Sequence, residues 1–228
     1  MKKVLVVETN TQQYGSVSEP TGLWLGESAE FVDEMQKAGV AVDYVSPLGG
    51  FVPLDPRSMK YVDTSIMGIY EDDDFIKRGL KNTLAPAAVD PDDYVAIYYT
   101  GGHGVMWDFP DNPELQALAA AIYKNNGYVM SVCHGIAGLF NIKDEHGQNV
   151  ISGKTITGFT ATEELIAGKR KVVPFLNRDM AVSRNATFKQ KRFYADYAVQ
   201  DDRLITGQNP FSVRSVAKLF LNAVGQLN

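Results

Sequence analysis

Short apolar runs separated by amphipathic segments dominate the pattern of this chain. Residues 3–8, 94–99 and 128–132 are nearly continuous runs of β-branched, aromatic and other apolar side chains. A strand that helices cover on both faces has this composition, whereas a strand with one solvent-facing side alternates between apolar and polar residues. The three runs therefore predict strands of a buried, mostly parallel sheet, and residues 40–45 have the composition of a fourth strand.

Amphipathic segments follow several of these runs, as expected of helices that connect parallel strands. Residues 27–39 place apolar side chains at helical spacing and end in a glycine, which commonly caps a helix. Residues 112–124 and 209–224 each begin with Asn-Pro, which favours a helix start, and each carries an apolar stripe. Residues 155–160 predict a further strand, and residues 198–206 predict a strand, an Asp-Asp turn and another strand. This order of elements is typical of an α/β protein.

Residues 48–91 interrupt the alternation of strands and helices. They contain several Pro and Gly residues and the acidic run 71–74, with a candidate helix at 73–84. We interpret the segment as an insertion that packs on the sheet edge. A length of 228 residues fits one domain with such an insertion, so we expect a single domain that spans residues 1–228.

Composition and charge exclude several classes of protein. Hydrophobic residues make up 45% of the chain, which is enough for a substantial core. The net charge of −5 makes nucleic acid an unfavourable partner. The apolar run at the start is too short for a signal peptide or a membrane span, so we expect a cytoplasmic protein without a membrane partner. The single cysteine rules out an internal disulfide.

Cys133 lies where a buried strand must turn into a helix, within the sequence Ser-Val-Cys-His-Gly of residues 131–135. A nucleophile on such a tight turn stands at the carboxyl end of the sheet with backbone N–H groups beside it. The positive end of the following helix, predicted at residues 136–140, would lower the pKa of the thiol. The alternative is a small buried hydrophobe, because free cysteine is among the most buried residue types.

Three further features are expected at the same edge of the sheet. The backbone N–H of His134 is placed to hold an oxyanion and its ring could pair with a thiolate, although a histidine that merely lines the turn is the alternative. The turn Gly101-Gly102-His103 follows a strand and lacks the residues of a phosphate loop, so it is either a ligand-contacting turn or an ordinary one. Glu27 lies in the first turn of a helix, a position that the helix dipole alone explains.

Taken together, these motifs resemble the ThiJ/PfpI superfamily, which has the fold of the class I glutamine amidotransferases. The resemblance is to the branch with heat-shock protein 31 type chaperones and glyoxalase III enzymes. It implies a flavodoxin-like three-layer α/β/α sandwich with a mostly parallel central sheet, a nucleophile elbow and a small insertion. The motifs that carry it span nearly the whole chain: Thr21-Gly22 before Glu27, the turn at 101–104, residues 131–135, residues 157–160 before Glu163-Glu164, and residues 206–210.

The resemblance also implies site residues. Cys133 and His134 would be catalytic, with Glu27 as the buried acid at the cysteine. The carboxylate that orients the histidine falls on Glu164, with Glu163 as the alternative one residue away. Gly101, Gly102 and His103 would form the oxyanion site and pocket.

The implied activity is conversion of methylglyoxal and related 2-oxoaldehydes to 2-hydroxy acids such as D-lactate, without glutathione, metal or other cofactor. We expect no metal site, because two of the three histidines already belong to these motifs. Alternatives are a non-enzymatic holdase that binds unfolded proteins and a cysteine-dependent amidase or peptidase. We expect a homodimer.

Overall fold

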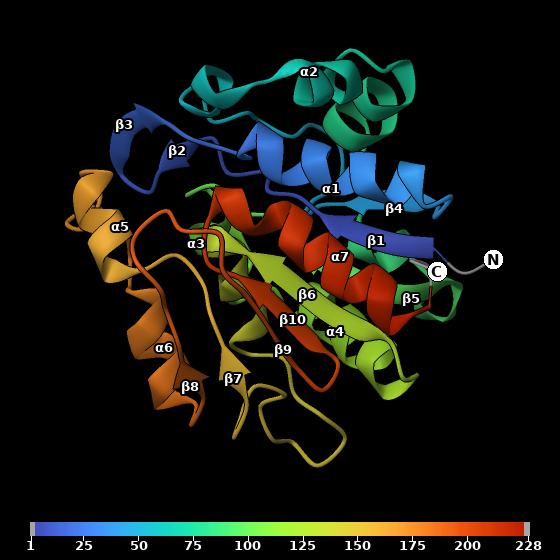
Figure 1. Ribbon diagram of the computed structural model, residues 1–228, viewed down its shortest axis with the longest axis vertical. Coiled ribbons are helices and arrows are strands. Elements are labelled where there is room, and N and C mark those ends of the chain that lie inside the picture. The colour runs from blue at the N-terminus through green and yellow to red at the C-terminus, as the bar shows by residue number, and fades with distance from the viewer. Residues whose placement is uncertain (1–2, 226–228) are drawn as a thin grey trace.

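Six strands form the central sheet in the computed structural model, which describes residues 3–225 (Figure 1). The strand order is β4-β1-β5-β6-β10-β9, and only β9 runs antiparallel to its neighbour. The bounds are β1 Lys3–Val7, β4 Val42–Val45, β5 Tyr94–Tyr99, β6 Tyr128–Val132, β9 Ala198–Asp201 and β10 Leu204–Gly207. The predicted mostly parallel sheet is confirmed.

Helices cover both faces of this sheet. Helices α1 and α7 lie together on one face and α4 lies on the other, which gives three layers (Figure 1). The α-helices are α1 Leu25–Lys37, α2 Thr64–Tyr70, α3 Val105–Asp108, α4 Pro113–Lys124, α5 Ala161–Ile166, α6 Asn177–Ser183 and α7 Val213–Ala223. A π-helix spans Phe75–Lys81, and 3-10 helices span Ser58–Tyr61, Pro86–Ala88, Pro91–Asp93, Cys133–Leu139 and Pro210–Ser212.

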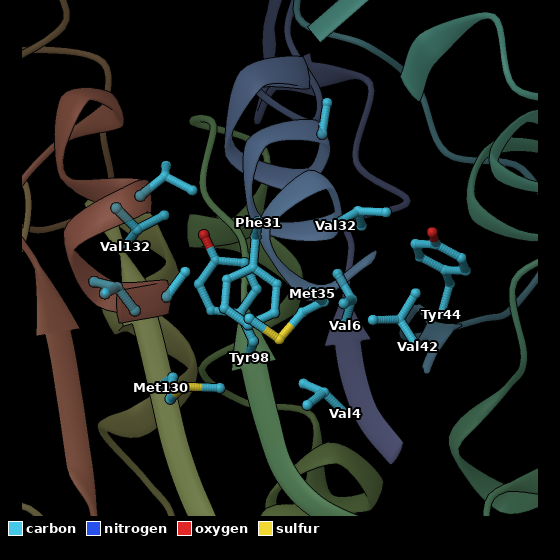
Figure 2. Packing of buried hydrophobic residues seen from close by; sticks show 14 of the residues in the cluster. Val4, Val6, Phe31, Val32, Met35, Val42, Tyr44, Tyr98, Met130 and Val132 are labelled. Atoms are coloured by element: carbon cyan, nitrogen blue, oxygen red, sulfur yellow. The ribbon is translucent and has the colours of Figure 1, made fainter. Parts of the chain in front are cut away.

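The continuous apolar runs are explained by two cores, one on each side of the sheet. Val4 and Val6 of β1 face α1, whereas Leu5 and Val7 belong to the core beneath α4. Both sets are fully buried, so no position of β1 from Val4 to Val7 is left for a polar residue. Figure 2 shows the α1 side, where the ring of Phe31 stacks on Tyr98 of β5 with 3.8 Å between ring centroids.

Two segments away from the turn at Cys133 differ from the sequence prediction. Only the first two residues of 155–160 form a strand, β7 (Thr155–Ile156), which pairs with β8 (Thr187–Phe188) outside the central sheet. From Thr157 the chain turns toward β10, because the Thr157 N–H donates to Thr206 Oγ1 at 2.9 Å. The polar stretch after β1 contains an unpredicted hairpin of β2 (Gln13–Tyr14) and β3 (Val17–Pro20).

Residues 48–91 pack along one side of the molecule, where α2 lies against α1 and the π-helix lies against β4 (Figure 1). The same segment also reaches the carboxyl end of the sheet. There Leu23 donates its N–H to the Pro53 carbonyl at 2.8 Å and accepts from the Asp55 N–H at 2.9 Å. This pairing brings the residues that follow Asp55 over the end of β5. No helix within the described residues is long and apolar enough to cross a membrane.

Candidate active site

The backbone at the end of β6 makes a strained, tight turn. Cys133 has φ +57°, in the left-handed region that non-glycine residues rarely adopt and that is often found at functional sites. A 3-10 helix begins at Cys133 itself, rather than the helix predicted at residues 136–140. Gly135 permits this turn to lie against β5, because a Cβ there would be 2.3 Å from the Tyr99 carbonyl oxygen.

The side chains of Cys133, His134 and Glu164 form a continuous line. Cys133 Sγ lies 3.3 Å from His134 Nδ1, and His134 Nε2 lies 2.8 Å from Glu164 Oε1. The His134 ring packs against Phe159, with 4.3 Å between ring centroids. This order of thiol, imidazole and carboxylate is the arrangement in which a base activates a nucleophile and a third group orients the base.

Glu27 lies on the other side of the thiol, in the first turn of α1. Its carboxyl is fully buried, and Oε2 accepts the Gly101 N–H at 2.6 Å. The Tyr98 hydroxyl donates to the backbone carbonyl of Glu27 at 2.9 Å, which fixes the position of this helical turn. Burial raises the pKa of Glu27 to about 8, even though the Cys133 and Gly101 contacts act in the opposite direction. The carboxyl is therefore mostly protonated near neutral pH and can exchange a proton there.

The thiol does not have the lowered pKa that the sequence predicts. Cys133 is 3% exposed, and burial, followed by the neighbouring Glu27 carboxyl, raises the pKa of the thiol well above its usual value. A 3-10 helix begins at Cys133 in place of the predicted helix, and its dipole does not offset the cost of burial. The thiol therefore needs a base, and His134 Nδ1 is the base within reach.

Glu163 and Glu164 have separate positions and partners. Glu164 contacts His134, whereas Glu163 Oε2 accepts the Thr160 N–H in a capping box at the start of α5. Oε1 of Glu163 accepts three more donors, namely the Tyr194 N–H at 2.7 Å and the side-chain amides of Gln208 and Asn209 at 2.9 Å each. Glu163 thus ties α5 to the end of β10.

Exchanging each glutamate for glutamine should separate the two roles. Glu163→Gln places an amide against donors in a buried site, so we expect the free energy of unfolding to fall by about 3 kcal/mol. Glu164→Gln should leave stability less affected and lower kcat/KM by about 10²-fold, because the histidine loses its charged partner. Urea unfolding and turnover measured on both variants check this. Equal loss of activity with no loss of stability in Glu163→Gln would contradict the assignment.

Gly101 and Gly102 lie so close to neighbouring residues that neither position has room for a side chain. A Cβ on Gly101 would lie 2.4 Å from Glu27 Oε2 and 3.0 Å from Cys133 Cβ. Gly102 has φ +103°, and a Cβ there would be 2.1 Å from the Gly22 carbonyl oxygen. Both positions therefore require glycine.

We expect Gly101→Ala to displace the Glu27 carboxyl and to lower kcat/KM by about 10²-fold, since small misplacements of reacting groups are costly. Gly68→Ala is the matched control, because nothing lies within 4 Å of a Cβ at that site in α2. It should keep full activity and gain stability of about 0.5 to 1 kcal/mol. Steady-state kinetics and thermal unfolding of both variants are the measurements, and full activity in Gly101→Ala would show that the close packing is unimportant.

His103, which the resemblance assigns to the oxyanion site and pocket, lines the cavity and contacts the other site residues through its side chain. Its Nε2 lies 2.9 Å from Glu164 Oε1, and its Nδ1 lies 2.9 Å from Arg57 Nη2. Arg57 and Phe159 were both missed as site residues. Arg57 has no motif around it in the segment 48–91, and Phe159 could have been found only through its place beside the Thr160 cap.

A cavity of about 470 Å³ opens onto Cys133, and its size is that of a small-molecule site. Its walls are mainly aromatic and apolar, with a few charged groups. The segment 48–91 supplies part of the lining through Arg57, Ser58, Lys60, Tyr61 and Ile66; other lining residues include Trp24, Glu30, Phe159, Tyr194 and Phe211. A small carbonyl compound could reach the thiol through this cavity.

His103, His134 and Glu164 form the one group within residues 3–225 whose ligand-type atoms lie close enough to share a metal ion, all within 4.8 Å. Both histidine Nε2 atoms lie at hydrogen-bond distance from the same oxygen, Glu164 Oε1. A metal ion would have to replace both contacts. The geometry that is present is that of an acid–base network.

Known proteins similar to this chain cover nearly its whole length. A profile of the DJ-1/PfpI family matches residues 25–223. The glutathione-independent glyoxalase HSP31 of Saccharomyces cerevisiae is 33% identical over 236 residues, which covers 98% of each chain. Rapid Encystment Protein 24 kDa of Francisella tularensis superposes with a TM-score of 0.94 at 37% identity and 100% coverage of both chains. Glyoxalase III of Candida albicans superposes with a TM-score of 0.89 at 28% identity and 97% coverage of both chains.

Proposed function

Because this chain belongs to the DJ-1/PfpI family, we propose that it is a glutathione-independent glyoxalase that uses Cys133 as its nucleophile. The 33% identical relative in Saccharomyces cerevisiae is named a glutathione-independent glyoxalase, and a 30% identical relative in Candida albicans is named glyoxalase 3. The observation that carries the proposal is the position of Cys133 at the cavity, between the His134 base and the protonated Glu27 carboxyl. The substrate is a small 2-oxoaldehyde such as methylglyoxal, and the product is a 2-hydroxy acid.

The first step is addition of Cys133 to the aldehyde carbon. His134 Nδ1 takes the thiol proton, and the sulfur then forms a bond to C1 while the carbonyl electron pair moves to oxygen. Glu164 stabilises the imidazolium that results, because its carboxylate lies 2.8 Å from Nε2. Gly102 and His134 both line the cavity, and we assign their backbone N–H groups to hold the alkoxide. Protonation of that oxygen gives a hemithioacetal.

The second step moves a hydrogen from C1 to C2 through an enediol. A base removes the C1 proton, the C–H electron pair forms a C1=C2 double bond, and the C2 oxygen takes a proton. Return of a proton to C2 and loss of the C1 hydroxyl proton then leave a lactoyl thioester. Glu27 is suited to this role because its pKa of about 8 lies near physiological pH. Its carboxyl gives its proton to the alkoxide in the first step, and the carboxylate that remains takes the C1 proton and returns it to C2.

The third step is hydrolysis of the thioester. Water attacks C1, the carbon–sulfur bond breaks, and the thiol is restored. C1 has been oxidised to the acid level and C2 reduced to an alcohol, so the reaction needs only water and no external oxidant or reductant. Cys133 supplies the thiol that forms the hemithioacetal, so no glutathione is needed.

Lactate formation from methylglyoxal in glutathione-free buffer tests the proposal. The full chain, assayed with and without a metal chelator, should release D-lactate at the same rate in both samples. Consumption of methylglyoxal without lactate, as simple modification of lysine and arginine would cause, would overturn the proposed function.

The alternatives from the sequence are separated by a second assay. A holdase would suppress aggregation of a model client protein equally well as Cys133→Ala, with no aldehyde turnover in the parent. An amidase or peptidase would release amine from peptide or amide substrates. The homodimer and the binding of unfolded proteins stay predictions, and sedimentation of the purified chain would test the first.

A further inference from the structure

A chain of hydrogen bonds runs beyond the catalytic residues to the segment 48–91. Arg57 Nη2 lies 2.9 Å from His103 Nδ1, and His103 Nε2 lies 2.9 Å from Glu164 Oε1. Asp55 holds the guanidinium through Nε at 3.0 Å and through Nη2 at 2.6 Å. The side chains of Asp55, His103 and Glu164 are all buried, so water does not compete for the contact between His103 and Glu164.

The chemistry of arginine fixes which group donates in each of these hydrogen bonds. A guanidinium only donates hydrogen bonds and stays protonated in proteins, so His103 Nδ1 must be the acceptor. Neutral His103 then carries its proton on Nε2 and donates it to Glu164 Oε1. That oxygen lies 2.8 Å from His134 Nε2, which is therefore a second donor, and His134 Nδ1 is left bare toward Cys133.

We propose that Arg57 and His103 are positioning residues that impose this direction, so that His134 always presents an unprotonated Nδ1 to the Cys133 thiol. The inference rests on the proposed roles of Cys133 and His134. It extends the line of Cys133, His134 and Glu164 by two side chains that do not touch the nucleophile. It also assigns a role to the segment 48–91, since pairing of Leu23 with Pro53 and Asp55 places Arg57 at the site.

The surroundings of His103 support a neutral ring. Burial, and then repulsion from His134, lower the pKa of His103 to about 4, although Glu164 acts to raise it. Its other close neighbours are Arg57 and the ring of Tyr14, whose centroid is 5.2 Å away. The ring centroids of His103 and His134 lie 4.1 Å apart. Two imidazolium ions at that distance would repel, so a neutral His103 leaves His134 free to take the thiol proton.

Histidine tautomers measured by NMR test the proposal without any substitution. The full chain, labelled with ¹⁵N-histidine, has three histidines, and His146 is an internal reference because its side chain is 75% exposed. We expect His103 to carry a proton on Nε2 alone and to stay neutral between pH 6 and 8. A proton on His103 Nδ1 at pH 7 would overturn the proposal.

Variants at Arg57 test the functional consequence. Arg57→Gln can accept as well as donate, so we expect alkylation of Cys133 by iodoacetamide to shift to higher pH and kcat to fall by about 10²-fold. KM should change little, and Arg57→Lys, which only donates, should restore much of kcat. Arg57→Gln leaves the buried Asp55 carboxylate without its guanidinium partner. If that variant folds poorly, the double variant Asp55→Asn with Arg57→Gln removes the unpaired charge. A higher KM with an unchanged alkylation profile would mean that Arg57 binds substrate instead, and would overturn the proposal.

These readouts separate the two hypotheses. The tautomer and the alkylation profile are measured on the free protein and do not depend on methylglyoxal. If the parent forms no lactate while His103 shows the expected tautomer, the glyoxalase proposal fails and the positioning role stands. If lactate forms while the tautomer is reversed, only the positioning role fails.

Discussion

Cys133→Ser is expected to lower kcat/KM for methylglyoxal by at least about 10³-fold, to the limit of detection. Serine keeps the size of the side chain, but its hydroxyl is far less acidic than a thiol, and His134 cannot ionise it for addition to the aldehyde. Cys133 is the single cysteine of the chain, so iodoacetamide labelling of the parent reports on one thiol only. Lactate release and intact-mass measurement are the two readouts.

The control for Cys133→Ser is a measurement that the variant is as stably folded as the parent. Serine also tolerates the positive φ at this position about as poorly as cysteine, so thermal unfolding of the variant should match that of the parent. Mass spectrometry of the parent, quenched during turnover, should reveal a lactoyl adduct on Cys133 that the variant lacks. Lactate formation by Cys133→Ser at the parental rate would contradict the covalent mechanism.

Glu27→Gln is expected to lower kcat/KM by about 10²- to 10⁴-fold, the usual contribution of one general acid–base. Glutamine has nearly the same shape and can still accept the Gly101 N–H, but it cannot release or take up a proton. Cys133 should remain open to alkylation, because the base His134 is unchanged. Turnover at the parental rate would show that another group moves the proton.

The matched control is Glu8→Gln. Glu8 is also fully buried, and burial raises its pKa to about 8, but it accepts from Ser28 Oγ at 2.6 Å and does not line the cavity. We expect Glu8→Gln to keep near-parental kcat/KM. The comparison therefore isolates contact with the thiol from burial of a carboxyl.

The raised pKa of Glu27 also predicts how stability depends on pH. Its pKa is about 8 when folded and 4.5 in its ordinary state, so between these values the folded protein holds a proton that the unfolded chain has lost. The free energy of unfolding therefore falls as pH rises through this window, by up to about 1.4 kcal/mol per pH unit. Glu27→Gln lacks this proton and should gain stability relative to the parent from pH 5 to pH 8, as urea unfolding at both pH values would measure.

The sheet and its main helices could be predicted from the chain because both are local patterns. Runs such as 94–99 have room for no polar side chain, and Asn112 caps α4 as its position before Pro113 indicates, accepting the Leu115 N–H at 2.9 Å. The strand expected at 155–160 ends after Ile156, because the chain then turns toward β10. Phe159 packs on the His134 ring instead of pairing with a neighbouring strand.

The candidate site was predicted in part, for a related reason. Cys133 and His134 stand where a strand turns into a helix, and the local pattern and the family resemblance both point there. Glu27 and Glu164 were indicated by the resemblance alone. Arg57 lies in a segment without a motif, 46 residues before the His103 ring that it contacts. No spacing rule connects the two, because the contact depends on how residues 53–55 run beside Leu23.

The order of strands and helices, the turn that carries the lone cysteine and the family to which the chain belongs all follow from the amino-acid sequence by itself. The tertiary structure decided which glutamate meets His134, that the thiol is buried with a raised pKa, and that a distant arginine closes the hydrogen-bond chain. The physical reason is that backbone preferences act over a few residues. Desolvation and hydrogen-bond direction, in contrast, depend on every group that folding brings around an atom.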